Sequence, residues 1–150
     1  MFSWLGDSVF AVRETAIDSV KRLVRQFGSD WAVSSGFLAN LLQMASNRNY
    51  LRRQTILFAM ASTCSVVSSS VITNLFLPCL ERLATDPIPN VRFNVAKTLE
   101  EIVPVVLASE MSSPQIVRDN ILPMLQQLQR DADVDVHDFA TRAINVIPAF

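Results

Sequence analysis

The sequence is poor in the residues that β structure, metal sites and nucleic-acid surfaces need. Its 150 residues include three glycines, two cysteines and one histidine, and only 18% are charged. So few glycines, and no run of alternating apolar and polar residues, argue against a β fold. A zinc site needs about four ligands at defined spacings, so no metal or other cofactor is expected. The formal net charge of −1 gives no field that would attract a phosphate backbone, so nucleic acid is not expected as a partner.

The two cysteines and the N-terminus bear on the compartment. Cys64 and Cys79 lie in apolar stretches, and no secretory feature accompanies them. We interpret them as buried free thiols in a reducing compartment, with a disulfide as the alternative. Met1–Asp7 is too short for a signal peptide and lacks a basic start. A cytoplasmic location is therefore expected, with the nucleus as a further one.

One long stretch without charge, Gln54 to Leu80, has to be distinguished from a membrane span. Serine, threonine and asparagine cluster in its middle, whereas a spanning helix needs about 20 mostly apolar residues. We therefore expect two buried helices joined by a serine-rich turn, and no contact with a membrane.

A pair of neighbouring residues, one apolar and one basic, recurs four times. The pairs are Val12-Arg13, Leu51-Arg52, Val91-Arg92 and Val136-His137, spaced by 39, 40 and 45 residues. From each first residue, the positions at +4, +8 and +11 share one side of a helix. The stripes are Val12/Ala16/Val20/Leu23, Leu51/Thr55/Ala59/Ser62, Val91/Val95/Leu99/Ile102 and Val136/Ala140/Ile144/Ile147.

Recurrence at this period is typical of HEAT or armadillo repeats, in which each repeat is a pair of antiparallel helices. A second apolar pattern upstream of each pair supplies the other helix, and Pro78 and Pro123 occupy equivalent positions in it, where they should begin or bend the helix. The predicted fold is all-α, an α-α superhelix forming one domain over residues 1–150. Its units are 1–28, 29–68, 69–108 and 109–150, about four and a half repeats. No polar capping face precedes the first unit, so we expect the C-terminal part of a longer solenoid.

Short polar turns should join the two helices of each repeat along one edge of the stack. They are Gly6–Ser8, Ser46–Asn49, Asp86–Asn90 and Asp131–Asp135. Longer connections, including Ala108 to Ser113, should lie on the opposite edge. Within the turns, Arg13, Arg52 and Arg92 recur with Asp7, Asn47 and Asp86 at nearly constant spacing. A buried polar ladder is predicted, with contact to a partner as the alternative.

Five strings occur in order along the chain: Trp4–Glu14, Lys21–Ala32, Asn49–Arg53, Asn90–Lys97 and Asp133–Val136. Together they resemble the scaffolding, A-type regulatory subunits of protein phosphatase 2A, collinearly over nearly the whole chain. The resemblance implies a non-catalytic scaffold whose short turns bind the catalytic subunit of a serine/threonine phosphatase. A regulatory B-type subunit would be bound only if upstream repeats exist.

Carried over position by position, the resemblance also implies contact residues. Most lie in the short turns, and one lies on a first helix. They are Val9, Phe10, Trp31, Tyr50, Arg53 and Ile88.

Each of these residues also has a purely structural interpretation. Phe10 stands where the family usually has tyrosine, and it and Trp31 could instead fill gaps between helices. Tyr50 and Ile88 lie in polar turns, where an apolar side chain is predicted to lack a core, so contact is favoured for them.

No enzyme motif is present, because His137 has no serine or cysteine partner in a recognisable arrangement. Calcium binding by Asp131, Asp133 and Asp135 would be weak, since the glycine and final glutamate of an EF-hand loop are missing. The sequence therefore predicts a binding protein and no enzyme. A generic HEAT-repeat adaptor that does not bind a phosphatase is the alternative function.

Overall fold

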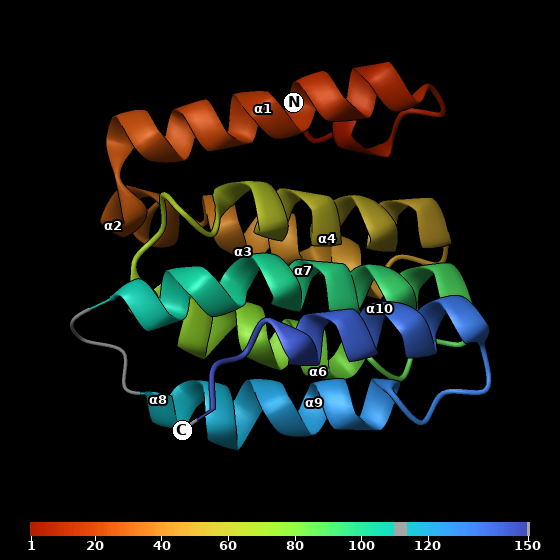
Figure 1. Ribbon diagram of the computed structural model, residues 1–150. Coiled ribbons are helices and arrows are strands. Elements are labelled where there is room, and N and C mark those ends of the chain that lie inside the picture. Colours follow the sequence, from red (N-terminus) through yellow and green to blue (C-terminus); the bar gives the residue numbers. More distant parts are fainter. Residues whose placement is uncertain (110–113, 150) are drawn as a thin grey trace.

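The computed structural model describes residues 1–109 and 114–149 (Figure 1). Within these ranges, all regular secondary structure is helical. The helices stack in pairs, from α1 at the top to α9 at the bottom of Figure 1. The second helices of the pairs pack on one another in chain order. They are α1 (Phe10–Phe27), α4 (Tyr50–Thr63), α7 (Pro89–Ala108) and α10 (Val134–Asn145). The predicted all-α stack of helix pairs is confirmed.

The first helices are divided into short pieces. Gly36, in the left-handed region at φ 72°, separates α2 from α3. Pro78 and Pro123 each stand near the start of an α-helical piece that follows a π-helical turn, as their equivalent positions predicted. Because proline donates no backbone hydrogen bond, the preceding turn loses one bond and widens. The pieces are η1 (Trp4–Gly6); α2 (Ser29–Ser34), α3 (Phe37–Leu42) and η2 (Gln43–Ser46); α5 (Ser69–Val71), η3 (Ile72–Phe76) and α6 (Leu77–Leu83); and α8 (Pro114–Ile116), η4 (Val117–Ile121) and α9 (Leu122–Leu128).

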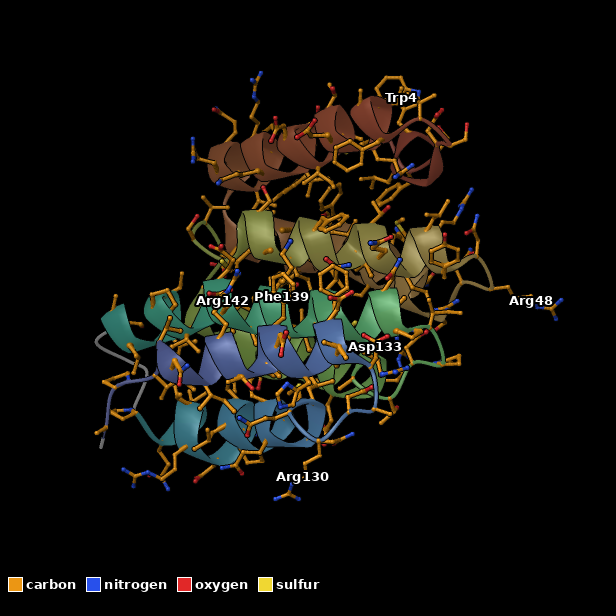
Figure 2. All side chains as sticks on the ribbon, turned by 45° about the vertical axis from the view of Figure 1, so that its right-hand side comes forward. Trp4, Arg48, Arg130, Asp133, Phe139 and Arg142 are labelled. Atoms are coloured by element: carbon orange, nitrogen blue, oxygen red, sulfur yellow. The ribbon has the colours of Figure 1, made fainter. Side chains whose placement is uncertain are left out.

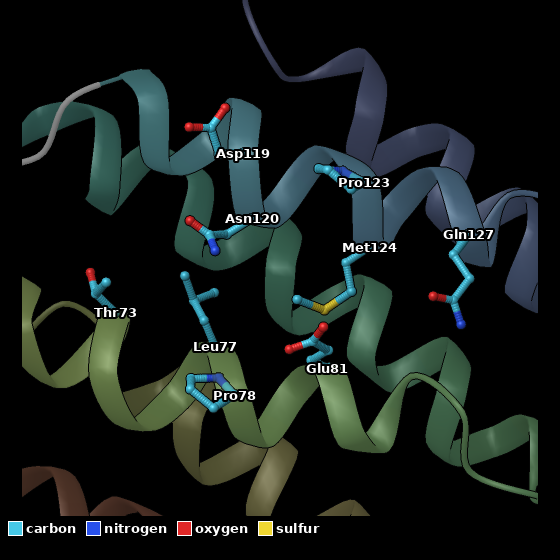
Figure 3. A pocket seen from close by; sticks show the side chains of 9 residues that line it. All are labelled: Thr73, Leu77, Pro78, Glu81, Asp119, Asn120, Pro123, Met124 and Gln127. Atoms are coloured by element: carbon cyan, nitrogen blue, oxygen red, sulfur yellow. The ribbon is translucent and has the colours of Figure 1, made fainter.

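The widened turns leave a hollow between the first helices of the last two pairs. Its volume is about 200 Å³, and Pro78 and Pro123 line it from opposite sides (Figure 3). Here α6 and α9 each pack on α7. The second helices therefore hold the stack together at this level.

The uncharged stretch forms two helical segments joined at its serine-rich middle, as predicted. The first part belongs to α4 and the second to α5, η3 and α6. Among the described residues, no helix is long and apolar enough to cross a membrane. The connection predicted from Ala108 to Ser113 falls mostly outside the described residues.

Most positions of the apolar stripes lie in the core, while Val12, Leu23, Ile144 and Ile147 are only partly buried, and one stripe has an error of register. Val91, Val95, Leu99 and Ile102 are fully buried. On α4, however, the residue equivalent to Arg13 and Arg92 is Arg53, so the predicted pair Leu51-Arg52 lies one residue too early. Thr55 and Ala59 of the predicted stripe are still buried, because α4 lies between α1 and α7 and buries most of its circumference. The true core stripe of α4 includes Ile56, Met60 and Thr63.

Each second helix begins after the same local turn. An Asp or Asn side chain accepts the backbone N–H two residues later, which bends the chain away from the first helix. The bonds are Val9 to Asp7 (2.8 Å), Asn49 to Asn47 (2.9 Å), Ile88 to Asp86 (2.9 Å) and Asp133 to Asp131 (2.9 Å).

Two arginines, each six residues after the asparagine or aspartate that opens its turn, link one turn to the next. In Arg53, Nη1 donates to the backbone oxygen of Asn47 (2.8 Å), while Nε and Nη2 donate to the Asp86 carboxylate (2.6 and 3.0 Å). Arg92 repeats this with the backbone oxygen of Asp86 (2.7 Å) and the carboxylate of Asp131 (2.6 and 2.9 Å). We call these two rungs the arginine ladder. The predicted ladder is thus confirmed for Arg92, but Arg53 and not Arg52 is its member on α4.

The ladder lacks a rung at each end. Arg13 binds the backbone oxygens of Asp7 (2.8 Å) and Ser8 (3.1 Å), but the next turn offers the neutral Asn47 in place of a carboxylate. At the other end His137 replaces arginine and lies 2.9 Å from its neighbour Asp138.

Replacing the fully buried Val95 by aspartate should unfold the chain. An unpaired carboxylate in the core costs several kcal/mol, against a total stability of about 5–15 kcal/mol. Circular dichroism at 25 °C should show loss of helix. The control Val33→Asp, at a half-exposed position, should keep the helical spectrum. A folded Val95→Asp variant would contradict the assigned core.

Asn47→Asp should add the missing rung opposite Arg13. A partly buried, bidentate ion pair is expected to raise stability by about 1 kcal/mol, which is about 2–4 °C in melting temperature for a chain of this size. Asn49→Asp serves as the control, because residue 49 caps α4 through its own side chain and has no equivalent in the ladder. Equal melting temperatures for the two variants would mean that no rung forms.

The ladder should also make stability depend on acid. The hydrogen bonds from Arg92 lower the pKa of Asp131 below its ordinary value, so the folded state favours the ionised carboxylate. This contribution is present above the unfolded pKa of about 3.9 and is lost as the pH falls from there through the folded pKa. Asp131→Asn should therefore lose less unfolding free energy than the wild type between pH 5 and about pH 2.5 in urea titrations. Asp135→Asn, which removes an exposed carboxylate, should follow the wild type.

Candidate protein-binding site

The four short turns lie along one edge of the stack, at the right of Figure 1. All second helices begin at this edge and run to the other side. With this edge turned forward, Arg48 of the second turn points away from the molecule (Figure 2). The turns therefore form a continuous row, which we call the turn edge, and the arginine ladder fixes the spacing of its last three turns.

The first turn presents an apolar surface. Val9 and Phe10 are each 55% exposed, although they stand at the start of a long helix. The guanidinium carbon of Arg13 lies 5.5 Å from the centre of the Phe10 ring. This contact holds the ring at the edge, since Arg13 beneath it is itself buried. Trp4, 58% exposed, adds a second aromatic side chain in η1 of the same helix pair.

The second turn contributes Tyr50, the first residue of α4, whose side chain is partly exposed. Arg53 lies beneath it in the ladder, with a side chain only 12% exposed. Its guanidinium is fully engaged within the molecule, and the hydrogen bond to Asp86 raises its pKa. Contact of Arg53 with a partner stays a prediction, while its internal role in positioning the turns is plain.

The third and fourth turns differ from what the sequence suggested. Ile88 is partly buried and packs against the core, so the prediction that its side chain lacks a core is wrong. Val134, 71% exposed, begins α10 at the position that Phe10 and Tyr50 hold in α1 and α4. The sequence analysis did not predict this residue, although Val134 follows Asp131 at the same separation in sequence as Phe10 follows Asp7.

Trp31 is not brought to the turn edge. It lies in α2, which follows the far end of α1. There its ring packs between Phe27 (4.9 Å between centroids) and Phe37 (5.5 Å). Its contact with a partner stays a prediction, at a place distant from the other five residues.

Two kinds of reactive group, metal ligands and thiols, can be located in the structure. In the part of the chain that the structure describes, no group of three or more His, Cys, Asp or Glu side chains could hold a metal ion. Cys64 and Cys79 are free and buried. Burial raises the pKa of both thiols, so they are protonated and poor nucleophiles at neutral pH.

Sequence comparisons place the chain among known proteins. Over 127 residues it is 42% identical to the A-type regulatory subunit of protein phosphatase PP2A from Saccharomyces cerevisiae, covering 83% of this chain and 20% of that protein. It is 45% identical over 71 residues to the protein of the same name in Schizosaccharomyces pombe, covering 47% and 12%. With the PP2A 65 kDa regulatory subunit of Drosophila melanogaster, identity is 48% over 67 residues, covering 45% and 10%. The chain thus spans a fifth or less of the length of these relatives.

A protein-family model described as the middle domain of PIK3R4-like proteins matches residues 39–147. This range runs from within α3 to just beyond α10, and so includes three of the four turns and both rungs of the arginine ladder. The protein therefore belongs to the PIK3R4-like middle-domain family, and most of its sequence is similar to part of the A-type regulatory subunit of protein phosphatase PP2A.

Proposed function

We propose that this protein is a scaffold or regulatory component that binds the catalytic subunit of a PP2A-type serine/threonine phosphatase through its turn edge. The observation that carries the proposal is the row of exposed apolar side chains at the first positions of second helices, Phe10, Tyr50 and Val134. Exposed aromatic side chains on a rigid support are typical anchors of protein interfaces.

The rigidity of the support comes from the arginine ladder. Arg53 and Arg92 bind the carbonyl oxygen of their own turn and the carboxylate of the next. A partner therefore meets turns whose mutual spacing is already set, which lowers the entropy lost on binding. The sequence similarity to PP2A regulatory subunits supports a phosphatase as the partner over the generic adaptor.

The proposed role is non-catalytic, and the relatives' description as regulatory subunits supports this. A regulatory B-type subunit is proposed as a further partner only where additional repeats precede these. We place the function in the cytoplasm, and in the nucleus as well, since two buried free thiols suit a reducing compartment.

Changing Phe10 and Tyr50 together to alanine should weaken binding to a purified PP2A-type catalytic subunit. Two aromatic anchors are expected to contribute about 2 kcal/mol or more, which is about 30-fold in Kd. Biolayer interferometry with the immobilised chain measures this, and circular dichroism checks that the helices remain.

Val146→Ala is the control, because Val146 is 49% exposed but follows the end of α10, at the edge opposite the turns. It should bind as the wild type does. If the wild-type chain fails to bind the catalytic subunit, or if the double variant binds equally well, the phosphatase proposal fails and the generic adaptor replaces it.

A further inference from the structure

The face formed by the second helices carries a groove of its own. One hollow of about 380 Å³ lies between α4 and α7, with α1 and α10 at its ends. A second hollow of about 260 Å³ lies between α1 and α4. Phe58 and Ser62 line both hollows, so the two form one groove that crosses the helices. Phe139 and Arg142, labelled in Figure 2, mark this face on α10.

Two lysines in the larger hollow have no carboxylate partner. The ammonium group of Lys97 lies over two aromatic rings, 5.6 Å from the centre of Phe93 and 5.5 Å from that of Phe139. Among the described residues no carboxylate comes within 4.0 Å of Lys97 or of Lys21, which lines the same hollow from α1. The aromatic rings hold the Lys97 ammonium group in place without using its N–H donors in ion pairs.

The two carboxylates that line the larger hollow do not cancel its positive charge. Arg142 forms a bidentate ion pair with Glu100, in which Nη2 donates to Oε2 (2.6 Å) and Nε donates to Oε1 (3.0 Å). Apart from this ion pair, the charged residues that line the larger hollow are two lysines, Lys21 and Lys97, and one carboxylate, Glu101. The hollow therefore has an excess of positive charge.

A buried amide supplies an independent sign of a ligand. Asn94 lines the larger hollow although it is only 1% exposed. Its side-chain nitrogen donates to the backbone oxygen of Asn90 (2.6 Å), and no donor from the described residues reaches its side-chain oxygen. A buried oxygen without a donor is unfavourable, and the backbone N–H of an incoming extended segment would satisfy it.

We propose that this groove binds an extended segment of a partner protein that carries an acidic side chain next to an apolar one. The carboxylate would lie between Lys97 and Lys21, a backbone N–H would donate to Asn94, and the apolar side chain would pack on Phe58. Glu14 and Asp18 line the smaller hollow, so a basic residue of the segment fits there and sets its direction. The proposal does not depend on the identity of the protein bound at the turn edge.

Selection of a random twelve-residue peptide phage library on the full chain tests the proposal. Enriched peptides should contain aspartate or glutamate beside an apolar residue. The best synthetic peptide, measured by fluorescence anisotropy, should bind Lys97→Glu at least about ten-fold more weakly. It should also shift the Asn94 side-chain amide signals in two-dimensional NMR spectra. Arg25→Glu, on an exposed position of α1 outside both hollows, should leave binding unchanged.

A charge exchange separates direct contact from a structural effect. A peptide whose acidic residue is replaced by lysine should bind Lys97→Glu better than it binds the wild type. If melting shows that Lys97→Glu is unfolded, Lys21→Glu, which makes no ring contact among those described, gives the same comparison. No enrichment, enrichment of basic or neutral peptides, or binding unaffected by the lysine changes would overturn the proposal.

Discussion

The arrangement of the last three turns depends on two arginine side chains, each of which binds two neighbouring turns. Arg53 and Arg92 each join the backbone of one turn to the carboxylate of the next, with side chains 12% and 17% exposed. Charges this poorly hydrated are tolerated only when their hydrogen bonds are satisfied, and such pairs contribute more to geometry than to net stability. The ladder therefore sets the register between helix pairs, while the apolar core supplies the free energy. The exposed residues of the last three turns take their spacing from the ladder.

The first helix pair is attached differently. Asn47 offers no carboxylate to Arg13, and at this level Arg52 lies flat against Gly6, where a Cβ atom would come within 2.5 Å of the arginine Cζ. A side chain at position 6 would displace Arg52, so the glycine here serves close packing between the first two pairs. The fully buried Leu5 adds an apolar contact at the same place. The first turn is thus positioned by packing, and the last three turns by ion pairs.

The sequence predicted the helix pairs, the four turns and the existence of a ladder, because the period and the turn chemistry are local signals. It failed where two neighbouring residues compete for one role. Arg52 and Arg53 stand side by side after the apolar Leu51. Only Arg53 lies six residues after the residue that opens its turn, as Arg13 and Arg92 do. The exposure of side chains in the turns was harder to predict from the sequence. Ile88 and Val134 stand in similar polar turns and differ only in how far the neighbouring helices cover them. The boundaries of the four units stay predictions, as do the partner contacts.

The groove shows why overall charge is a poor guide to local binding. A net charge of −1 indicates no attraction for an anionic partner, yet Lys21 and Lys97, far apart in the sequence, line one hollow. Four of the aspartates that balance them belong to the last turn and the start of α10. The stack of helix pairs thus gives the groove two ends of opposite charge, with Glu14 and Asp18 in the smaller hollow and an excess of basic side chains in the larger one. Screening acts over about 10 Å at ordinary salt, so an extended segment seated in the groove would respond to the lysines beside it and not to the net charge of the chain.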